Sequence, residues 1–348
     1  MTMTRPLLDA LVGDEEIETL LGDAAQLAAM VRFERALAEA EATSGLISAE
    51  AAAAIAAGLA GFAPDWDDLA RGLARDGVVV PALVAQMRRG IAAPHGADLH
   101  KGATSQDVID TALVLQLSAI VAVYEARLEA LLDGFDALAQ AAGAQKLMAH
   151  TRMQQALPFT VADKLATWEV PLQRALQEIR ASRKSLLVIQ LGGPVGDRAS
   201  FGGMGEAVAR ALAQQLDLGL AEPWHSARDQ LVGFASLLSL LTGTLGKFGA
   251  DVALMAQNEV ADIALAGGGG SSAMAHKSNP VNAEVLVALA RYNAGLVGTL
   301  HQAMVHENER SGAAWTLEWL TLPAMLKTTG ASLRLAQALL GQISFPVK

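Results

Sequence analysis

The sequence of 348 residues contains no cysteine and few aromatic residues, which make up 4% of the chain. Without cysteine the protein has no disulfide, no thiol nucleophile and no cysteine-ligated metal site, as is common in reducing compartments. The first residues lack the apolar run of a signal peptide, and the longest uncharged stretch, residues 230–246, is too short to span a membrane. We therefore expect a soluble, cytoplasmic protein with no membrane partner.

Positive charge is also scarce: 26 lysines and arginines stand against 36 aspartates and glutamates, which gives a formal net charge of −10. A chain this acidic is not expected to bind nucleic acid or an anionic lipid surface. The seven histidines show no metal-binding spacing, since His301 and His306 are five residues apart and do not share a helix face. We expect no metal, and an anionic substrate must meet a local group of cations.

Alanine and leucine dominate what is present, and hydrophobic residues make up 52% of the chain. This composition predicts an all-α protein with a large core. Short helices are predicted at the beginning of the chain: one stops at Gly45, Ser48 caps the next, and Pro64-Asp65 opens another. We expect residues 1–103 to form an N-terminal helical domain.

Three much longer helices are predicted further along, over residues 107–142, 161–190 and 228–266, with Pro171 kinking the second. A helix of about 36 residues is about 54 Å long, and the third is apolar on more than one face. A lone chain could hardly bury three such rods. We therefore expect residues 104–348 to form a long-helix bundle whose core is shared between identical subunits.

A glycine-rich stretch, AGGGGSSAMAHKSNPVNAE, interrupts this helical sequence at residues 266–284. A flexible linker would explain the glycines and serines but not the HKSNP directly behind them. Phosphate and dinucleotide loops are excluded because no strand is predicted before the glycines. The remaining interpretation is an active-site loop over residues 266–282 that closes over a carboxylate, which the backbone N–H groups, Lys277 and Asn279 would bind.

A second polar cluster, DLHKGATSQDVIDTA, spans residues 98–112 and leads into the first long helix. Thr104 or Ser105 capping that helix would explain much of the pattern. A helix N-terminus with free hydroxyl and N–H groups also binds anions, so capping and ligand binding are compatible interpretations.

Two further stretches carry polar side chains in predicted turns. In MAHTRMQQALPFTVADK, Thr151, Arg152 and Gln154 crowd the turn into the second long helix, where solvated loop residues are the simpler alternative. In HENERSGAAWTLEW, near the end of the chain, Arg310 is a candidate carboxylate ligand, although such charged stretches usually form a solvated helix face.

These clusters, in this order, resemble the fumarase/aspartase superfamily from about residue 30 to about residue 330. GGSSAMAHKSNP is similar to its signature G-S-S-x-M-P-x-K-x-N-P, with Ala275 in place of the proline that follows Met, and GATSQDVIDTA and HTRMQQALP are similar to its other two conserved regions. Lyases of the superfamily carry a histidine where this chain has Arg152. LHKGATSQDVIDTAL, QLGGPVGD and HENERSGAAWTLEWLTLP are most similar to the carboxymuconate cycloisomerase branch.

The resemblance implies a cofactor-free homotetramer with a core built from helices of four subunits, active sites completed by loops of three subunits, and a largely missing C-terminal domain. It implies conversion of the small tricarboxylate 3-carboxy-cis,cis-muconate to 4-carboxymuconolactone, by intramolecular carboxylate addition through an aci-carboxylate. The implied catalytic residues are Ser271, which matches the proton-transfer serine, Lys277, and His100 as a candidate assistant. The implied substrate-binding residues are Thr104, Ser105, Gln106, Thr151, Arg152, Gln154, Asn279 and Arg310.

Two alternatives remain open. A lyase of the adenylosuccinate or argininosuccinate type has the same fold, and Arg152 disfavours it because the leaving group would lack its histidine acid. A catalytically silent helical scaffold is the other, and the polar loops disfavour it because a scaffold has no need of Ser271, Lys277 and Asn279 in register.

Overall fold

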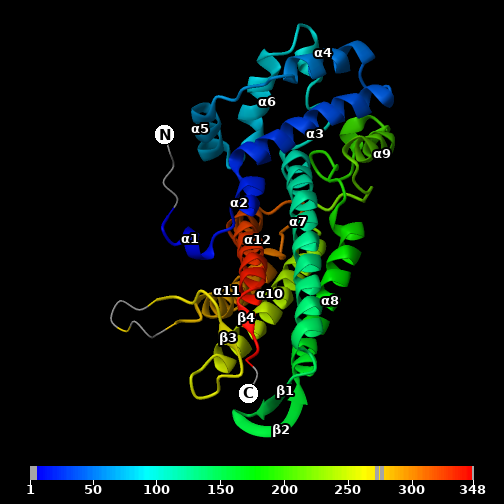
Figure 1. The fold of residues 1–348 in the computed structure, drawn as a ribbon. Helices are drawn as coiled ribbons and strands as arrows, with labels where there is room; N and C mark the ends of the chain where they lie inside the picture. Colours follow the sequence, from blue (N-terminus) through cyan, green and yellow to red (C-terminus); the bar gives the residue numbers. More distant parts are fainter. Residues whose placement is uncertain (1–5, 271–273, 275–277, 347–348) are drawn as a thin grey trace.

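The computed structural model describes residues 6–270, 274 and 278–346. Its long helices lie side by side in an elongated bundle, and short helices cover one end (Figure 1). The long helices are α7 (Ser105–Ala142), α8 (Val161–Leu186), α10 (Asp229–Met255), α11 (Val281–Ala303) and α12 (Gly312–Leu340). The predictions of the first two long helices are confirmed to within a few residues, and α8 runs through Pro171.

The prediction of a third helix as far as residue 266 is wrong at its C-terminal end, because α10 stops at Met255. The chain turns back after that residue: Ala261 has a left-handed backbone (φ 47°), and the Asp262 N–H donates to the Met255 carbonyl (3.0 Å). Strand β3 (Ala264–Leu265) then pairs antiparallel with β4 (Ile343–Ser344). A short antiparallel strand pair therefore follows α10, in place of the predicted continuation of the helix.

The short helices at one end begin and end where local signals place them. They are α1 (Asp9–Val12), α2 (Glu15–Leu21), α3 (Asp23–Thr43), α4 (Ala49–Leu59), α5 (Trp66–Asp76), α6 (Val80–Arg89) and α9 (Gly205–Leu216), with 3₁₀ turns at His95–Asp98 and Ala199–Phe201. Ser48 accepts from the Ala51 N–H (3.0 Å) and Asp65 from the Asp68 N–H (3.0 Å), as N-caps do. Both predicted caps are confirmed.

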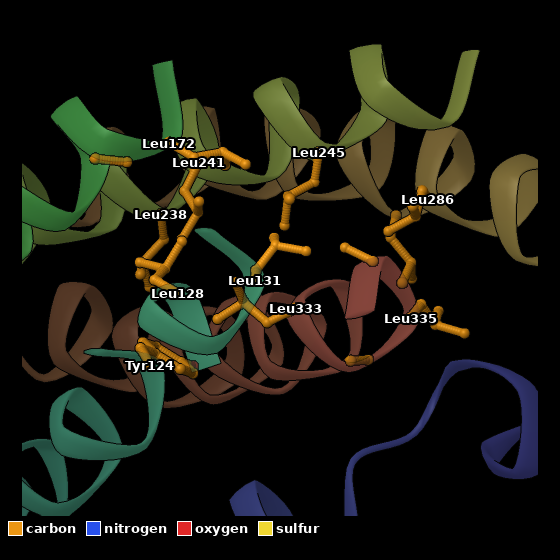
Figure 2. Packing of buried hydrophobic residues seen from close by; sticks show 14 of the residues in the cluster. Tyr124, Leu128, Leu131, Leu172, Leu238, Leu241, Leu245, Leu286, Leu333 and Leu335 are labelled. Atoms are coloured by element: carbon orange, nitrogen blue, oxygen red, sulfur yellow. The ribbon is translucent and has the colours of Figure 1, made fainter. Parts of the chain in front are cut away.

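The hydrophobic residues form two cores. One lies inside the long-helix bundle, where leucines of α7, α8, α10 and α12 interdigitate around Tyr124 (Figure 2), whose hydroxyl donates to the Leu326 carbonyl (2.5 Å). The other lies among α3 to α6, α9 and the first turns of α7, and includes Phe33, Leu83 and Leu212. The second core draws on both sides of residue 103, and the domain division at that residue stays a prediction.

A β-hairpin joins α7 to α8 at the end of α7 that lies farthest from the short helices (Figure 1). Strands β1 (Lys146–Thr151) and β2 (Gln154–Thr160) pair antiparallel around Arg152 and Met153, whose φ values of 48° and 66° form the tight turn. Their side chains are largely exposed to solvent. The hairpin therefore projects from the bundle and is not part of either core.

Two helices, α7 and α10, are long and apolar enough to cross a membrane by length and composition. More than half of the most apolar window of each is buried inside the bundle, as in the core helices of soluble proteins. Some apolar side chains remain uncovered in a single chain, since Leu240 of α10 is 71% exposed and Leu320 of α12 is 72% exposed.

Candidate functional site

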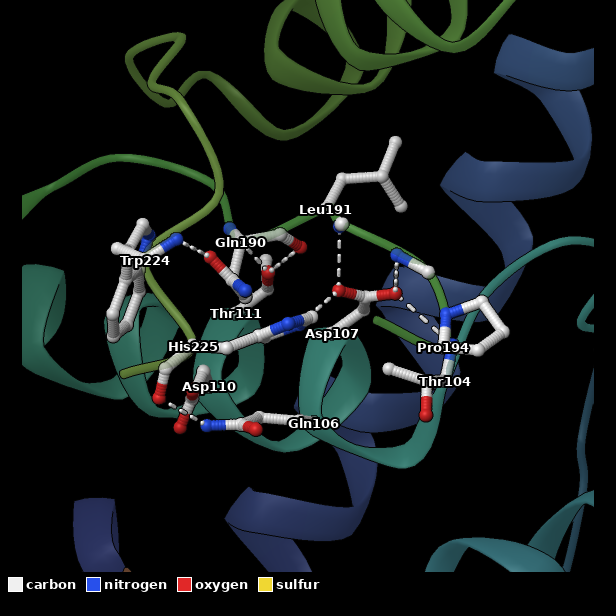
Figure 3. A network of polar contacts seen from close by, with 12 residues as sticks. Thr104, Gln106, Asp107, Asp110, Thr111, Gln190, Leu191, Pro194, Trp224 and His225 are labelled. Carbon is white, nitrogen blue, oxygen red and sulfur yellow. Dashed lines mark hydrogen bonds and ion pairs between the residues drawn. The ribbon is translucent and has the colours of Figure 1, made fainter. Parts of the chain in front are cut away.

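The first turn of α7 is held by one buried carboxylate, that of Asp107 (Figure 3). Asp107 accepts from the backbone N–H groups of Thr104 (3.0 Å), Gly192 (2.8 Å) and Gly193 (3.0 Å). The His225 ring donates to it from Nε2, also at 2.8 Å. These bonds tie the helix N-terminus to a glycine-containing loop 85 residues away in sequence, so Asp107 fixes the shape of the site.

Two of the predicted substrate-binding residues contact each other next to this turn. The buried Gln106 donates through Nε2 to the His225 carbonyl (2.8 Å), and its Oε1 accepts from Nε of Arg310 (2.8 Å). Arg310 also donates to the Pro194 carbonyl (3.3 Å) and is exposed. Gln106 therefore orients an accessible guanidinium beside the N-terminus of α7, where Thr104 and Ser105 are half-buried.

A buried cluster of charged side chains lies close to the segment that carries Arg310. Arg228 is fully buried and donates to both carboxylate oxygens of Asp110 (2.6 and 3.1 Å) and of Glu318 (2.9 and 2.6 Å). The Trp315 indole N–H donates to Asp110 (3.2 Å), and the His306 ring lies 3.4 Å from Glu318. The cluster joins α7 to α12 and to the segment that leads to Arg310, so it supports the position of the guanidinium.

The electrostatics of this cluster favour its charged form. Burial alone would lower the pKa of Arg228, but the carboxylates of Asp110 and Glu318 raise it instead. Burial likewise pushes the pKa of Glu318 up, but the neighbouring His306 and Arg228 lower it overall. None of these residues was among the predicted site residues. The signal available was an aspartate three residues after Asp107, on the buried face of a predicted helix.

His100 lies in the turn that precedes α7. Its Nδ1 is 2.6 Å from Oε1 of Glu34 on α3, and 16% of its side chain is exposed. Gly102 shapes this turn with a positive φ of 73°, and a Cβ there would lie 2.8 Å from the Phe201 ring. The Ser200 hydroxyl donates to the Gly102 carbonyl (2.5 Å). The turn is therefore packed against its neighbours, and His100 lies at the same end of the molecule as Thr104.

The structure places Thr151, Arg152 and Gln154 at the tip of the hairpin, all of them exposed. Gln154 donates to the neighbouring Met153 carbonyl (3.1 Å), and Arg152 helps to line a cavity of about 330 Å³ between the hairpin and α10. Helix α7 has 38 residues and is about 57 Å long. Within one chain the hairpin tip is therefore not brought together with Arg310 and the N-terminus of α7, which lie at the other end (Figure 1).

The flanks of the glycine-rich loop are paired with each other. Gly269 and Asn279 exchange two backbone hydrogen bonds (2.9 and 2.8 Å), just before α11 begins. A Cβ at Gly269 would lie 2.5 Å from the Val281 side chain, so close packing requires this glycine. The predicted catalytic residues Ser271 and Lys277 lie outside the described residues.

Comparison with known proteins places this arrangement in a family. The sequence matches the lyase family over residues 10–294. It is 41% identical to the 3-carboxy-cis,cis-muconate cycloisomerase of Pseudomonas aeruginosa over 96% of this chain and 74% of that protein, and 40% identical to that of Pseudomonas putida over 97% and 82%. The crystal structure of 3-carboxy-cis,cis-muconate lactonizing enzyme from Pseudomonas putida is similar with a TM-score of 0.91 and 39% identity, over 98% of this chain and 78% of that one. The expected all-α, fumarase/aspartase-type fold is confirmed.

Proposed function

The chain belongs to the lyase family, the family of the fumarase/aspartase fold, and from this membership we propose that it converts 3-carboxy-cis,cis-muconate to 4-carboxymuconolactone. The observation that carries the proposal is the identity of about 40% to enzymes of that name along almost the whole chain. The local geometry agrees with it, because a guanidinium and a helix N-terminus lie side by side where an anionic substrate would bind.

The proposed reaction is an internal addition that needs no cofactor. One carboxylate oxygen of the substrate forms a C–O bond to a carbon of its double bond, and the electron pair moves onto an adjacent carboxylate to give an aci-carboxylate. A proton then adds to carbon and restores that carboxylate, so the product is an isomer of the substrate. The catalytic requirement is electrostatic, namely fixed donors around the group that gains negative charge.

The end of α7 would bind one of the three substrate carboxylates. Thr104 and Ser105 bring hydroxyl groups and the free N–H groups of the helix terminus, and Arg310 brings a guanidinium that Gln106 already orients. Donors held in place before the substrate arrives lose little freedom on binding. This site therefore serves to position the substrate.

Protonation and charge stabilisation are assigned to the glycine-rich loop. Ser271 delivers the proton to carbon, with His100 as its assistant, and Lys277 with Asn279 stabilises the aci-carboxylate. The paired flanks at Gly269 and Asn279 support this assignment, because they give the loop a defined base from which it can close.

Arg152 is assigned to the carboxylate that acts as nucleophile, together with Thr151 and Gln154. A guanidinium suits this role because it holds a carboxylate in a fork of two hydrogen bonds, and no departing group needs a histidine acid here. This assignment requires a second subunit, because the hairpin tip and the start of α7 lie at opposite ends of one chain.

The proposed assembly is a homotetramer in the cytoplasm, with each active site shared between subunits. The uncovered apolar side chains of the long helices support it. Leu240, Leu254 and Tyr292 are 71%, 40% and 54% exposed in the single chain, and contact with other copies would remove them from water.

The experiment is an ultraviolet assay of the purified protein with 3-carboxy-cis,cis-muconate, which follows loss of the conjugated diene. We expect absorbance loss with formation of 4-carboxymuconolactone, identified by mass spectrometry as an isomer of the substrate. Adenylosuccinate and argininosuccinate serve as matched substrates for the lyase alternative. Turnover of either, with no loss of the diene from the muconate, would contradict the proposed reaction.

A further inference from the structure

We propose that Glu34 is a positioning residue for His100: it holds the imidazole through Nδ1, so that Nε2 is presented to the substrate carboxylate at the start of α7. This inference rests on the proposed function, in which the N-terminus of α7 binds an anion. Glu34 belongs to α3, in the middle of the short-helix core, and would act only through His100.

The contact between the two side chains is short and shielded. Nδ1 of His100 is 2.6 Å from Oε1 of Glu34, and the Glu34 side chain is fully buried while 16% of the His100 side chain is exposed. A charged hydrogen bond of this kind is among the stronger and more directional contacts in proteins. Glu34 therefore holds the imidazole from inside the core, while the His100 ring remains partly accessible to solvent.

The geometry of imidazole determines where the second nitrogen points. Nδ1 and Nε2 are separated by one ring carbon and their hydrogen-bonding directions diverge, so a ring whose Nδ1 contacts Glu34 directs Nε2 away from that carboxylate. Within the part of the chain that the structure describes, Nε2 of His100 has no hydrogen-bond partner, and it is not among the buried unpaired atoms. It is therefore free for a ligand next to Thr104 and Ser105.

The backbone at His100 is held in an uncommon conformation. Its φ is 63°, in the left-handed region that residues other than glycine seldom adopt, although histidine does so more often than most. Such a conformation persists only when the surroundings favour it, and it is more frequent at functional sites. The Glu34 contact and the packing of Gly102 on Phe201 provide that support.

The charges around the ring favour its protonated form. Burial alone would lower the pKa of His100, but the Glu34 carboxylate raises it above its ordinary value, with a smaller contribution from Asp107 and opposition from Arg88. The charged and titratable groups that face this cluster are Glu34 and Glu41 from α3, Arg88 from α6, Asp98 and Lys101 from the preceding turn, and Asp107 from α7.

Glu41 does not compete for this role. Burial, and then the charge of Glu34, raise the pKa of Glu41 to about 9, so its side chain is neutral near pH 7. Neither of its oxygens has a hydrogen-bond partner among the described residues. Glu34 is therefore the carboxylate that favours the protonated form of His100, and an imidazolium there would add to the positive field of the α7 terminus.

The consequence is a pH dependence with a definite sign. Because the pKa of His100 is raised in the folded protein, the imidazolium is lost only as the pH rises through that raised value. Without Glu34 the same loss occurs at lower pH. A residue with a merely structural role would change the amount or stability of folded protein but not the pH at which kcat/KM declines.

The experiment compares Glu34→Gln with Glu39→Gln in the full chain. Glu39 is on the same helix and pairs with Arg35 at the surface (3.6 Å), so it controls for the loss of one charge from α3. We expect the alkaline decline of kcat/KM to move to lower pH by about 1 to 3 units in Glu34→Gln and to stay in place in Glu39→Gln. An unmoved decline in Glu34→Gln would overturn the proposal.

The Glu34→Ala variant tests whether Glu34 positions the His100 ring, separately from its effect on the charge of that ring. At a pH below the pKa that the His100 ring has in Glu34→Ala, the ring is protonated with or without its partner. We expect kcat/KM at this pH to fall at least about tenfold in Glu34→Ala, where the ring is no longer held, and much less in Glu34→Gln, whose amide still accepts from Nδ1–H. Equal activity of Glu34→Ala and wild type at this pH would contradict the positioning role.

A titration that needs no turnover separates this inference from the proposed reaction. The histidine C2–H signals of wild type, Glu34→Gln and Glu39→Gln are followed by NMR, with His100→Gln to assign the His100 signal. We expect the pKa of His100 to lie above its ordinary value in wild type and to fall in Glu34→Gln alone. An ordinary or lowered value in wild type would overturn the inference even if Glu34→Gln does not fold, whereas the expected shift in a protein inactive on the muconate would refute only the proposed reaction.

Discussion

The two ends of α7 differ in how their polar side chains are held. At the N-terminal end, Gln106 and Asp107 are buried and each makes several hydrogen bonds, and Arg310 is fixed by Gln106. At the other end, Arg152 is exposed on a hairpin tip and makes no hydrogen bond or ion pair within the described ranges. One end is a prepared binding surface within a single chain, whereas the other still lacks a partner. This difference suggests that the hairpin serves a site in another subunit.

The largest expected effect comes from the glycine-rich loop, residues 266–282. Ser271→Ala should lower kcat by about 10² to 10⁴ with KM close to unchanged, because a positioned proton donor acts mainly in the transition state. Steady-state kinetics with 3-carboxy-cis,cis-muconate measures both constants. Turnover close to wild type would remove Ser271 from the mechanism.

A second prediction compares how much each end of α7 contributes to the free energy of unfolding of the protein. Glu318→Gln should destabilise the protein by about 3 to 5 kcal/mol, because it removes one carboxylate from the buried Arg228. Arg152→Ala should change the free energy of unfolding by no more than about 0.5 kcal/mol, as exposed substitutions usually do. Thermal and urea unfolding of both variants provides the measurement. Equal destabilisation would show that the hairpin tip is as firmly packed as the α7 end.

A third prediction concerns the role of the hairpin in catalysis. Arg152→His should lower kcat/KM for lactonisation by about 10- to 100-fold, because a charged hydrogen bond of about 1.5 to 3 kcal/mol to a substrate carboxylate is lost. It should not create adenylosuccinate or argininosuccinate lyase activity. Arg152→Lys is the matched variant, which keeps the positive charge but cannot form the paired hydrogen bonds of a guanidinium. Its kcat/KM should lie between those of wild type and Arg152→His. An unaffected rate in Arg152→His would mean that this side chain is merely solvated.

Local signals made much of the fold predictable from sequence. The caps at Ser48 and Asp65 and the start of α7 at Thr104 depend on residues within one turn, and the structure has them where they were expected. The end of α10 depends instead on the left-handed turn at Ala261 and on the pairing of β3 with β4, about 80 residues away. Such long-range pairing leaves no local signal.

In the candidate site, too, single residues could be predicted from local motifs, whereas their long-range contacts could not. Motifs identified Gln106 and Arg310 separately, but their contact spans 204 residues of sequence and could not be read from either motif. The support of Arg228 by Asp110 and Glu318 spans 118 and 90 residues. The partner of His100 was missed for a related reason: α3 also carries Glu39 and Glu41, and only the fold shows that Glu34 is the glutamate that contacts His100.

The central claim is that one active site combines the α7 end of one chain with the hairpin of another. Arg310→Ala and Arg152→Ala variants, each impaired alone, should regain part of the activity when they are denatured together and refolded as mixed oligomers, because some sites then combine an intact Arg310 with an intact Arg152 from different chains. The Arg152→Ala/Arg310→Ala double variant refolded with wild type controls for dilution of intact chains, and native mass spectrometry verifies mixing. Recovery above the sum of the separately refolded variants is the predicted result. Recovery no greater than that sum in verified mixed oligomers would contradict a shared site.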